Sequence, residues 1–388
     1  MAPTGRAAKV FSYYSGFPAY TIHKRIYKYD MNGYSRYKFT LDFNRQKDTL
    51  FIVDEASMLD GNSNILDDLI KYVFSGARCK LILLGDDAQL PPVGSIESPA
   101  LNSSVMMRYG LDVDEYTLTE VVRQEEESGI LKNATMLREM ISEASYFQTM
   151  TEAHLPLIEF GKDFRKVKNY DLIERISTAY DKCGIEDTTI VCRSNKRANL
   201  YNNAIRNQIL FYEEELEQGD ILMIAKNNYF WESEATPFLA NGDIAVVKRV
   251  RNEQEFFGFH FADCELSLPD YGDVTITAKV LLDTLHSDAP SLTDEQGEML
   301  YNNVMEDYMD ISNKKDRLEA LKKDPYYNAL QVKYAYAVTC HKAQGGQWKR
   351  VFIDQGLVSP DMITTEYYRW LYTAITRATK RVYMVNWK

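Results

Sequence analysis

The sequence is poor in the patterns that mark metal sites, disulfide frameworks and membrane spans. Its 388 residues include only 5 cysteines and 5 histidines. These are scattered without metal-ligand spacing, so we expect no zinc site and a reducing, cytoplasmic compartment. No apolar run approaches the roughly 18 residues of a membrane-spanning helix, so we expect no association with a membrane.

Composition and charge place the chain among ordinary globular proteins with two or more domains. Hydrophobic residues make up 45% and charged residues 26% of the chain. The net charge of −11 is unevenly spread, because residues 1–50 and 333–388 carry +6 each and leave −23 for the middle. Two basic ends favour binding of a polyanion at those segments. The alternative is chance variation in charge on solvated faces.

Hydrophobic periodicity predicts most of the secondary structure. We expect the helix Gly5–Tyr14 to end before Gly16, and the strand Thr188–Cys192 to lead into a helix capped by Ser194. The remaining expected helices are Asn62–Phe74, Ile130–Ser142 and one that starts at Thr364. The remaining expected strands are Phe51–Val53, Leu81–Leu84, Tyr334–Val338 and Arg381–Val385, and alternating strands from Gly242 to about Phe261 indicate a small barrel.

Two carboxylates follow the short apolar strand Phe51–Val53. Asp54 and Glu55 would lie at its carboxyl end, where open α/β sheets bind their ligands. In nucleotide hydrolases such a pair holds Mg²⁺ and activates the attacking water. Taken alone, the pair is equally compatible with an acidic turn after a core strand.

Other polar segments follow apolar ones along the chain. They are Ala2–Lys9, Leu83–Gly94, Leu118–Gln124, Val338–Gly345 and Leu371–Ala378. Together with the Asp54–Glu55 strand, these segments resemble motifs Ia, III, IV, V, VI and II of the superfamily 1 helicases. The resemblance is closest to the RecD-like and Dda-like branch, and it covers nearly the whole chain.

The resemblance implies an α/β fold with two RecA-like parallel-sheet motor domains, a small hairpin insertion and an SH3-like β-barrel insertion. The first motor domain would span residues 1–144, with the hairpin at 26–47, and would be truncated at its N-terminus. The second would comprise residues 145–242 and 333–388. The barrel and a charged helical region would occupy 243–332, and we assign no role to the charged residues 293–323.

The resemblance also implies ATP and Mg²⁺ as cofactors. Asp54 would hold Mg²⁺, Glu55 would position the attacking water, and Gln89 would sense the γ-phosphate. Arg123 and Arg377 would stabilise charge on the phosphoryl oxygens. Gly345 would allow the backbone to approach the nucleotide.

Single-stranded DNA and junctions between single and double strands are the implied partners, with translocation in the 5′→3′ direction and roles in DNA repair or recombination. The residues implied in DNA contact are Thr4, Arg6, Thr21, His23, Pro92, Thr339, His341 and Lys342. Residues 26–43 alternate around Asn32-Gly33, which predicts a hairpin. Its aromatic side chains suit either stacking on bases, as in a strand-separating pin, or cross-strand pairs.

One element of the family pattern is not found. The family has a phosphate-binding loop, Gly-x-x-x-x-Gly-Lys-Ser/Thr, about 25 residues before motif Ia. Here motif Ia starts at Ala2, and no Gly-Lys-Ser/Thr occurs in the sequence. We therefore expect a fragment of a longer ATP-dependent helicase, and no ATP hydrolysis by these residues alone. The alternatives are a loop supplied by a partner, a non-enzymatic single-stranded-DNA-binding protein, or a pseudo-ATPase that serves as an interaction module.

Overall fold

The computed structural model describes residues 1–29, 39–59, 64–92, 94–95, 97–118, 128–147, 155–156, 158–231 and 238–387. Contacts divide the chain into two compact units. Unit 1 comprises residues 1–44 and 210–335, and unit 2 comprises residues 45–209 and 336–388. Each unit therefore combines stretches that are distant in the sequence. The domain boundaries expected from the motifs follow the helicase resemblance and not the contacts, and they stay predictions.

Unit 1 contains a closed five-stranded barrel. Its strands follow the order β10-β11-β7-β8-β9, and only the β10–β11 pair is parallel. Side chains that alternate along the strands fill the interior, among them Val247 and Phe261, both 0% exposed. Phe257 and Gly258 both have positive φ, as a tight two-residue hairpin between β8 and β9 requires. The strands are β7 (Ile221–Ile224), β8 (Ile244–Phe256), β9 (Phe259–Leu268), β10 (Val274–Leu281) and β11 (Leu330–Tyr334).

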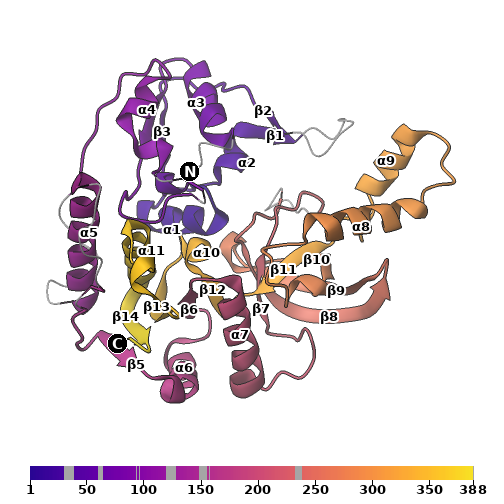
Figure 1. Cartoon of the computed structure of the whole chain (residues 1–388). Helices are drawn as coiled ribbons and strands as arrows, with labels where there is room; N and C mark the ends of the chain where they lie inside the picture. Colours follow the sequence, from indigo (N-terminus) through magenta and orange to yellow (C-terminus); the bar gives the residue numbers. More distant parts are fainter. Residues whose placement is uncertain are drawn as a thin grey trace. The chain divides into compact units, whose positions relative to one another are not determined.

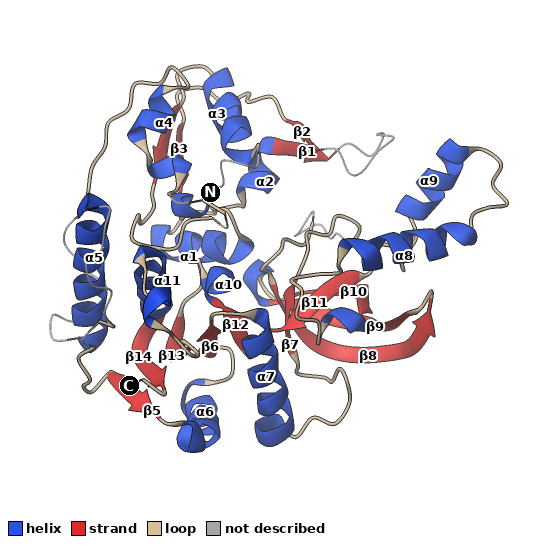
Figure 2. Cartoon of the chain, viewed as in Figure 1, coloured by secondary structure: helices blue, strands red, loops and turns tan. Residues whose placement is uncertain are grey.

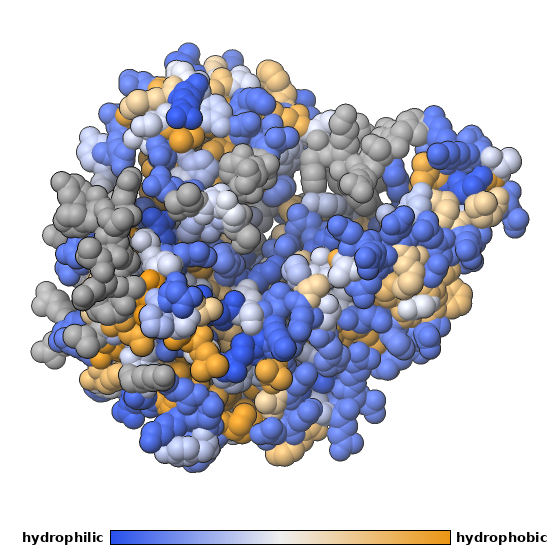
Figure 3. Space-filling view, in the orientation of Figure 1, coloured by the Kyte–Doolittle hydropathy of each residue, from blue (hydrophilic) through white to orange (hydrophobic). Residues whose placement is uncertain are grey.

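The charged region between β10 and β11 forms two helices, as expected. They are α8 (Asp294–Glu306) and α9 (Lys314–Lys322), and they project from the barrel (Figure 1). Thr293 and Gln296 form a capping box that starts α8. Leu300, Val304 and Leu321 pack on barrel residues that include Phe259 and Phe261. The surface of this arm is mainly hydrophilic (Figure 3).

The N-terminal part of unit 1 contains two capped helices and a pair of short strands. Thr4 and Gly16 bound α1 (Gly5–Ser15), and Thr21 caps α2 (Ile22–Ile26). The strands β1 (Tyr27–Tyr29) and β2 (Phe39–Leu41) pair antiparallel, as the hairpin prediction requires. The expected turn at Asn32-Gly33 lies outside the described residues.

Unit 2 contains two parallel sheets (Figure 2). The smaller pairs β3 with β4, and the larger follows the order β12-β6-β13-β14-β5 with every pair parallel. All five residues of β6 are buried, as is typical of a strand covered on both faces. The strands are β3 (Leu50–Val53), β4 (Lys80–Leu83), β5 (Phe164–Val167), β6 (Thr188–Cys192), β12 (Ala337–Thr339), β13 (Trp348–Asp354) and β14 (Ala378–Val385).

Helices and short helical turns complete unit 2. Ser194 accepts a hydrogen bond from Arg197 N and so caps α7, as expected. Thr364 caps α11 in the same way. The longer helices are α3 (Ile65–Ser75), α5 (Gly129–Phe147), α6 (Asn169–Cys183), α7 (Asn195–Ile205) and α11 (Thr365–Ile375). The shorter ones are η1 (Ala56–Met58), η2 (Pro99–Leu101), α4 (Ser103–Met107), η3 (Arg206–Leu210), α10 (Cys340–Ala343) and η6 (Pro360–Met362).

One expected strand is wrong. Tyr334–Val338 is not continuous, because its two ends pair in different sheets. Tyr334 pairs with Leu222 in the barrel, whereas Ala337 pairs with Ile190 in the five-stranded sheet. The boundary between the two units lies between Ala335 and Tyr336. An apolar run alone does not reveal such a change of partner.

The parallel sheets and the closed barrel confirm the expected α/β fold class with a barrel insertion. Within the described part of the chain, no helix has the length and apolar character needed to cross a membrane. All five cysteines are free thiols.

Candidate functional site

Asp54 and Glu55 follow β3 directly, as predicted. The Glu55 backbone N–H donates a 2.9 Å hydrogen bond to Asp54 Oδ1, and both side chains are half-buried. Glu55 has φ of 53°, a left-handed conformation that is strained for a residue with a side chain. Such strain is typical of functional sites, because the surrounding structure must hold it in place.

The loop after β4 passes close to η1. A Cβ on Gly85 would lie 2.9 Å from the backbone nitrogen of Ser57, so a side chain does not fit there. Asp86 Oδ1 accepts a 3.1 Å hydrogen bond from Ala88 N and closes the turn. Gln89 is 7% exposed, and its Oε1 accepts no hydrogen bond from any residue that the structure describes. A buried amide oxygen without a donor is costly, so this atom is a candidate ligand contact.

Two side chains from the C-terminal part of unit 2 hold Leu90, the next residue. Leu90 N donates a 2.8 Å hydrogen bond to Thr373 Oγ1. Leu90 O accepts a 2.7 Å hydrogen bond from Gln344 Nε2. The segments that resemble motifs III, V and VI therefore meet at a single backbone residue.

A second contact joins the segments that resemble motifs III and VI through Asp86. Its Oδ2 accepts a 2.6 Å hydrogen bond from Tyr372 Oη, and its Oδ1 accepts one of 2.7 Å from Arg138. Arg138 also donates to Asp87 at 2.8 Å. Burial raises the pKa of Tyr372, and Asp86 raises it further, so the phenol stays protonated and donates. Burial opposes the charge of Arg138, but Asp86, Tyr372 and Asp87 outweigh burial and raise its pKa.

Arg138 was not among the predicted site residues. It lies on α5 among the buried Ala134, Leu137 and Ile141, where a single basic residue looks like an ordinary surface position. No sequence pattern distinguishes it from the other basic residues of a helix.

Arg377 lies just after α11 and is 4% exposed. Its guanidinium donates to Thr373 O at 3.1 Å and to Thr376 Oγ1 at 3.2 Å. Arg377 Nη1 lies 4.0 Å from Glu55 Oε1. The structure thus brings together Glu55 and Arg377, two of the predicted catalytic side chains. A third, Gln89, precedes Leu90, which is bound by Thr373, one helical turn before Arg377. The remaining one, Arg123, lies outside the described residues.

The segment that resembles motif V surrounds α10. Thr339 is its N-cap residue, and Gly345 has φ of 71°. Burial lowers the pKa of Lys342 to about 8. Burial also lowers the pKa of His341, although Glu366 opposes this shift.

A cavity of about 300 Å³ lies beside His341. Arg193 is placed over the rings of Tyr367 and Trp370, at 5.7 and 5.9 Å from their centroids. These three side chains were not predicted, because only their position in the fold brings them beside His341. The cavity is lined by Leu90, Arg193, Cys340, His341, Met362, Thr364, Glu366, Tyr367 and Trp370.

The predicted DNA-binding residues of unit 1 have structural contacts of their own. Thr4 Oγ1 and Thr21 Oγ1 accept 3.2 Å hydrogen bonds from Ala7 N and Lys24 N. The His23 ring lies 5.9 Å from that of Phe238, and burial lowers the pKa of His23. The neutral imidazole is therefore favoured at neutral pH. Arg6 is half-buried in α1, and the DNA roles of these residues stay predictions.

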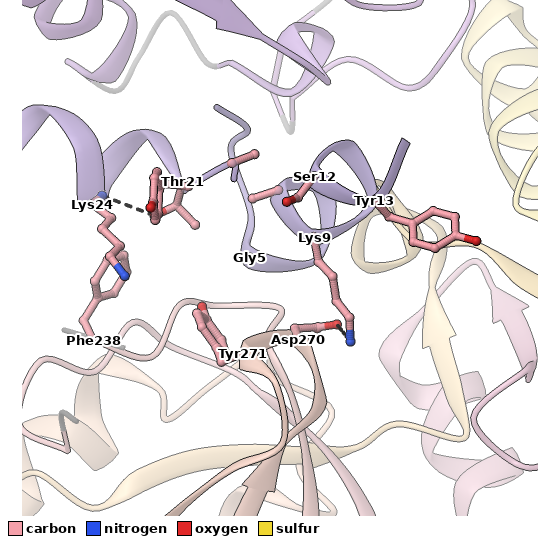
Figure 4. A pocket seen from close by; sticks show the side chains of 12 residues that line it. Gly5, Lys9, Ser12, Tyr13, Thr21, Lys24, Phe238, Asp270 and Tyr271 are labelled. Atoms are coloured by element: carbon pink, nitrogen blue, oxygen red, sulfur yellow. Dashed lines mark hydrogen bonds and ion pairs between the residues drawn. The ribbon is translucent and has the colours of Figure 1, made fainter. Parts of the chain in front are cut away.

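A larger cavity, of about 420 Å³, lies beside α1 and α2 in unit 1 (Figure 4). A Cβ on Gly5 would lie 2.6 Å from Asp243 Oδ1 and from Tyr271 Oη, so only glycine allows α1 to start this close to the barrel. The cavity is lined by Gly5, Ala8, Lys9, Ser12, Tyr13, Ala19, Tyr20, Thr21, Lys24, Phe238, Asp270 and Tyr271.

The residues at the end of β3 fit Mg²⁺ better than a transition metal. Among the described residues, no group of three or more His, Cys, Asp and Glu side chains could hold a metal ion. Asp54 and Glu55 supply hard carboxylate oxygens, and the buried Gln89 Oε1 has no described donor. Mg²⁺ is commonly held by one or two carboxylates, with substrate phosphates and water as its other ligands.

Comparison with known families assigns a class to each end of the chain. The family model of the AAA domain matches residues 1–152, which include Asp54, Glu55 and Gln89. The family model of the UvrD-like helicase C-terminal domain matches residues 334–385, which include His341, Gly345 and Arg377. The resemblance to superfamily 1 helicases that the motifs predicted is therefore confirmed.

The chain is also similar to individual proteins. It is 23% identical over 377 residues to the uncharacterized protein R530 of Acanthamoeba polyphaga mimivirus, covering 86% of this chain and 74% of that protein. A structure of Pif1 helicase from Bacteroides with ADP-AlF3 and single-stranded DNA matches 99% of this chain and 81% of its own, at 14% identity and a TM-score of 0.44. A structure of Pif1 helicase from Candida albicans matches 88% of this chain and 73% of its own, at 16% identity and a TM-score of 0.40. The two domain models define the similarity to helicases.

Proposed function

We propose that this chain is the motor part of an ATP-dependent DNA helicase of the RecD and Dda type, which translocates 5′→3′ along single-stranded DNA. The observation that supports this most is the 4.0 Å approach of Arg377 to Glu55, which are 322 positions apart in the sequence. The loop of Gln89 is bound to the same C-terminal segment through Leu90. A carboxylate, an amide and a buried guanidinium are the groups that phosphoryl transfer to water uses.

Each side chain would have a distinct role in hydrolysis. Asp54 would hold Mg²⁺, which supplies positive charge against the phosphate oxygens when it is bound. Glu55 would orient the attacking water and accept its proton. Gln89 Oε1 would bind that water or report the presence of the γ-phosphate. Arg377 would leave Glu55 and donate to the γ-phosphate oxygens, where charge spreads in the transition state.

DNA contacts are proposed within each unit separately. In unit 2 we assign Thr339, His341, Lys342 and Pro92 to the DNA backbone. In unit 1 we assign it Thr4, Arg6, Thr21 and His23. Since His23 is half-buried and favoured in its neutral form, it would contribute through its ring and not through a positive charge. The barrel would serve as the SH3-like insertion and the β1–β2 hairpin as the strand-separating pin.

ATP hydrolysis with and without single-stranded DNA tests the proposal. It is measured on residues 1–388 and on the same chain joined to an upstream phosphate-binding segment. Only the joined chain should show DNA-stimulated hydrolysis, and Glu55→Gln should lower its kcat by about 10²–10⁴-fold while nucleotide binding is kept. The exposed Glu143 on α5 is the matched control, since Glu143→Gln should leave turnover unchanged.

Three outcomes would contradict the proposal. Hydrolysis that survives Glu55→Gln would show that this carboxylate does not activate water. DNA binding without hydrolysis in the joined chain would favour the non-enzymatic single-stranded-DNA-binding protein. If the joined chain neither binds DNA nor hydrolyses ATP, the pseudo-ATPase interaction module would be favoured.

A further inference from the structure

The first 29 residues combine positive charge with aromatic rings. They contain five Lys or Arg residues and no Asp or Glu, although the whole chain carries a net charge of −11. They also contain seven Phe or Tyr residues. An anionic partner with flat rings would find complementary groups here.

Four of these rings are exposed on the C-terminal end of α1 and the loop that follows it. The exposed fractions are 82% for Tyr13, 62% for Tyr14, 75% for Phe17 and 44% for Tyr20. Tyr13 and Tyr14 contact each other edge to face, with centroids 5.3 Å apart. Large rings exposed together on a protein surface mark an interaction site more often than single exposed residues do.

This aromatic face, defined as Tyr13, Tyr14, Phe17 and Tyr20, continues into the 420 Å³ cavity. Tyr13 and Tyr20 line both, and Phe238 and Tyr271 supply further rings in the cavity (Figure 4). This volume lies within the range of about 300–1,000 Å³ that is common for small-molecule sites.

Lysines stand beside these rings. Lys24 Nζ lies 5.2 Å from the centroid of Tyr20, and Lys9 Nζ lies 3.8 Å from Asp270 Oδ1. Asp270 is the only carboxylate among the residues that line the cavity, and Lys9 offsets its charge. An acidic peptide would bind the lysines, but it would not account for the four exposed rings. A nucleic acid strand presents bases and phosphates at once, and so uses both.

We propose that the aromatic face and its cavity bind unpaired bases of single-stranded DNA by stacking. The proposal rests on the DNA-binding function proposed above and extends it, because the earlier contacts are to the DNA backbone. Tyr13 and Tyr20 each stack on a base, and Lys24 contacts an adjacent phosphate. Stacking is tolerant of sequence, because every base has a π-face.

The test distinguishes contacts to the DNA bases from contacts to the DNA backbone. Fluorescence anisotropy measures binding of the 388-residue chain to labelled oligothymidylate and to an abasic oligomer of the same length. Replacing both rings, by Tyr13→Ala with Tyr20→Ala, should weaken oligothymidylate binding by roughly 5- to 150-fold for each stacked base lost. Binding of the abasic oligomer should not change, and the salt dependence should be kept because the phosphate contacts remain.

Two controls exclude general damage. Tyr13→Phe with Tyr20→Phe keeps both rings and should bind oligothymidylate as the unmodified chain does. Tyr170→Ala removes a ring that is 76% exposed on α6, outside the aromatic face, and should have no effect.

Several results would overturn the proposal. Equal losses for both oligomers would assign the rings a structural role, and unchanged oligothymidylate binding would exclude stacking here while leaving the DNA function intact. Failure of the unmodified chain to bind either oligomer would overturn this proposal and the DNA part of the proposed function together. Self-association that the alanine variant abolishes would assign the face to a protein contact. Tighter binding of an oligouridylate of the same length would assign it to RNA.

Discussion

The side-chain amide of Gln344 donates a 2.7 Å hydrogen bond to the backbone carbonyl of Leu90, and both residues are buried. Thr373 holds the N–H of the same residue at 2.8 Å. Leu90 directly follows Gln89, the candidate γ-phosphate sensor. A displacement of Gln89 would therefore be transmitted to α10 and α11, which carry the candidate DNA contact His341 and lead to Arg377. The two hydrogen bonds would give a physical route between the proposed nucleotide and DNA contacts.

Removing either hydrogen bond should destabilise unit 2. Thr373→Val keeps the shape of the side chain but leaves Leu90 N without its acceptor, and Gln344→Leu leaves Leu90 O without its donor. Each should cost about 1–3 kcal/mol, because a buried polar group is left unpaired. Urea unfolding measures the loss. Because both side chains bind one residue, the double variant should deviate from additivity by at least about 0.5 kcal/mol, and strict additivity would show that they act independently.

The sequence predicted the segments that resemble helicase motifs well, because their patterns are local. A strand followed by two carboxylates, or a serine before a helix, is visible in a few consecutive residues, and β3 and α7 confirm both. The helical caps at Thr4 and Gly16 agree with the expected bounds of α1 within one residue.

Contacts between distant segments could not be predicted in this way. Nothing near Arg138 in the sequence indicates that it meets Asp86 and Tyr372, 52 and 234 positions away. The division of Tyr334–Val338 between two sheets depends on the partner strands and not on the residues themselves. The expected roles of Thr4 and Thr21 in DNA contact did not anticipate that their hydroxyls cap helices.

The pair Tyr372 and Asp86 should contribute to stability through one charged hydrogen bond. Tyr372→Phe removes only the hydroxyl that lies 2.6 Å from Asp86 Oδ2. The expected loss is about 1.5–3 kcal/mol in the free energy of unfolding, measured in urea. Tyr116, which is 88% exposed, is the matched control, and Tyr116→Phe should change nothing. If Tyr372→Phe leaves the free energy of unfolding unchanged, Arg138 alone is sufficient to hold Asp86.

DNA binding should weaken as the pH rises through about 8, the lowered pKa of the half-buried Lys342. Its ammonium is charged at pH 7 and mostly neutral at pH 9, so one phosphate contact is lost. The slope of log K against log salt should become shallower by roughly 0.7 between these pH values. Folding stability should move the other way and rise between about pH 8 and pH 10.4, because the unfolded chain then binds the extra proton.

An arginine at this position tests that assignment. Arginine stays charged across the range, so Lys342→Arg should remove the pH dependence of DNA binding. Burial lowers the pKa of Lys333 on β11 to about 8 as well, which makes Lys333→Arg the matched control. If Lys333→Arg flattens the pH profile and Lys342→Arg does not, the DNA contact has been assigned to the wrong lysine.

Asp243 should make unit 1 less stable as the pH rises from about 4 to 7. Burial raises its pKa to about 7, although Tyr271 Oη and Ala240 N both donate to its Oδ2. Asp270 adds to the upward shift. The folded chain therefore binds more protons than the unfolded chain in this interval, and stability falls by roughly 4 kcal/mol at most across it.

Replacement by an uncharged amide isolates this effect. Asp243→Asn keeps an oxygen acceptor, so at pH 8 it should be more stable than the unmodified chain, and its stability should no longer fall between pH 4 and 7.

Asp263→Asn is the opposite control. Burial alone would raise the pKa of Asp263, but hydrogen bonds from Lys279 and Asn252 lower it. Its ionised form is stabilising, so that variant should lose stability above about pH 4. Thermal unfolding at pH 5 and pH 8 measures both, and a loss of stability in Asp243→Asn at pH 8 would show that the ionised carboxylate is needed where it is buried.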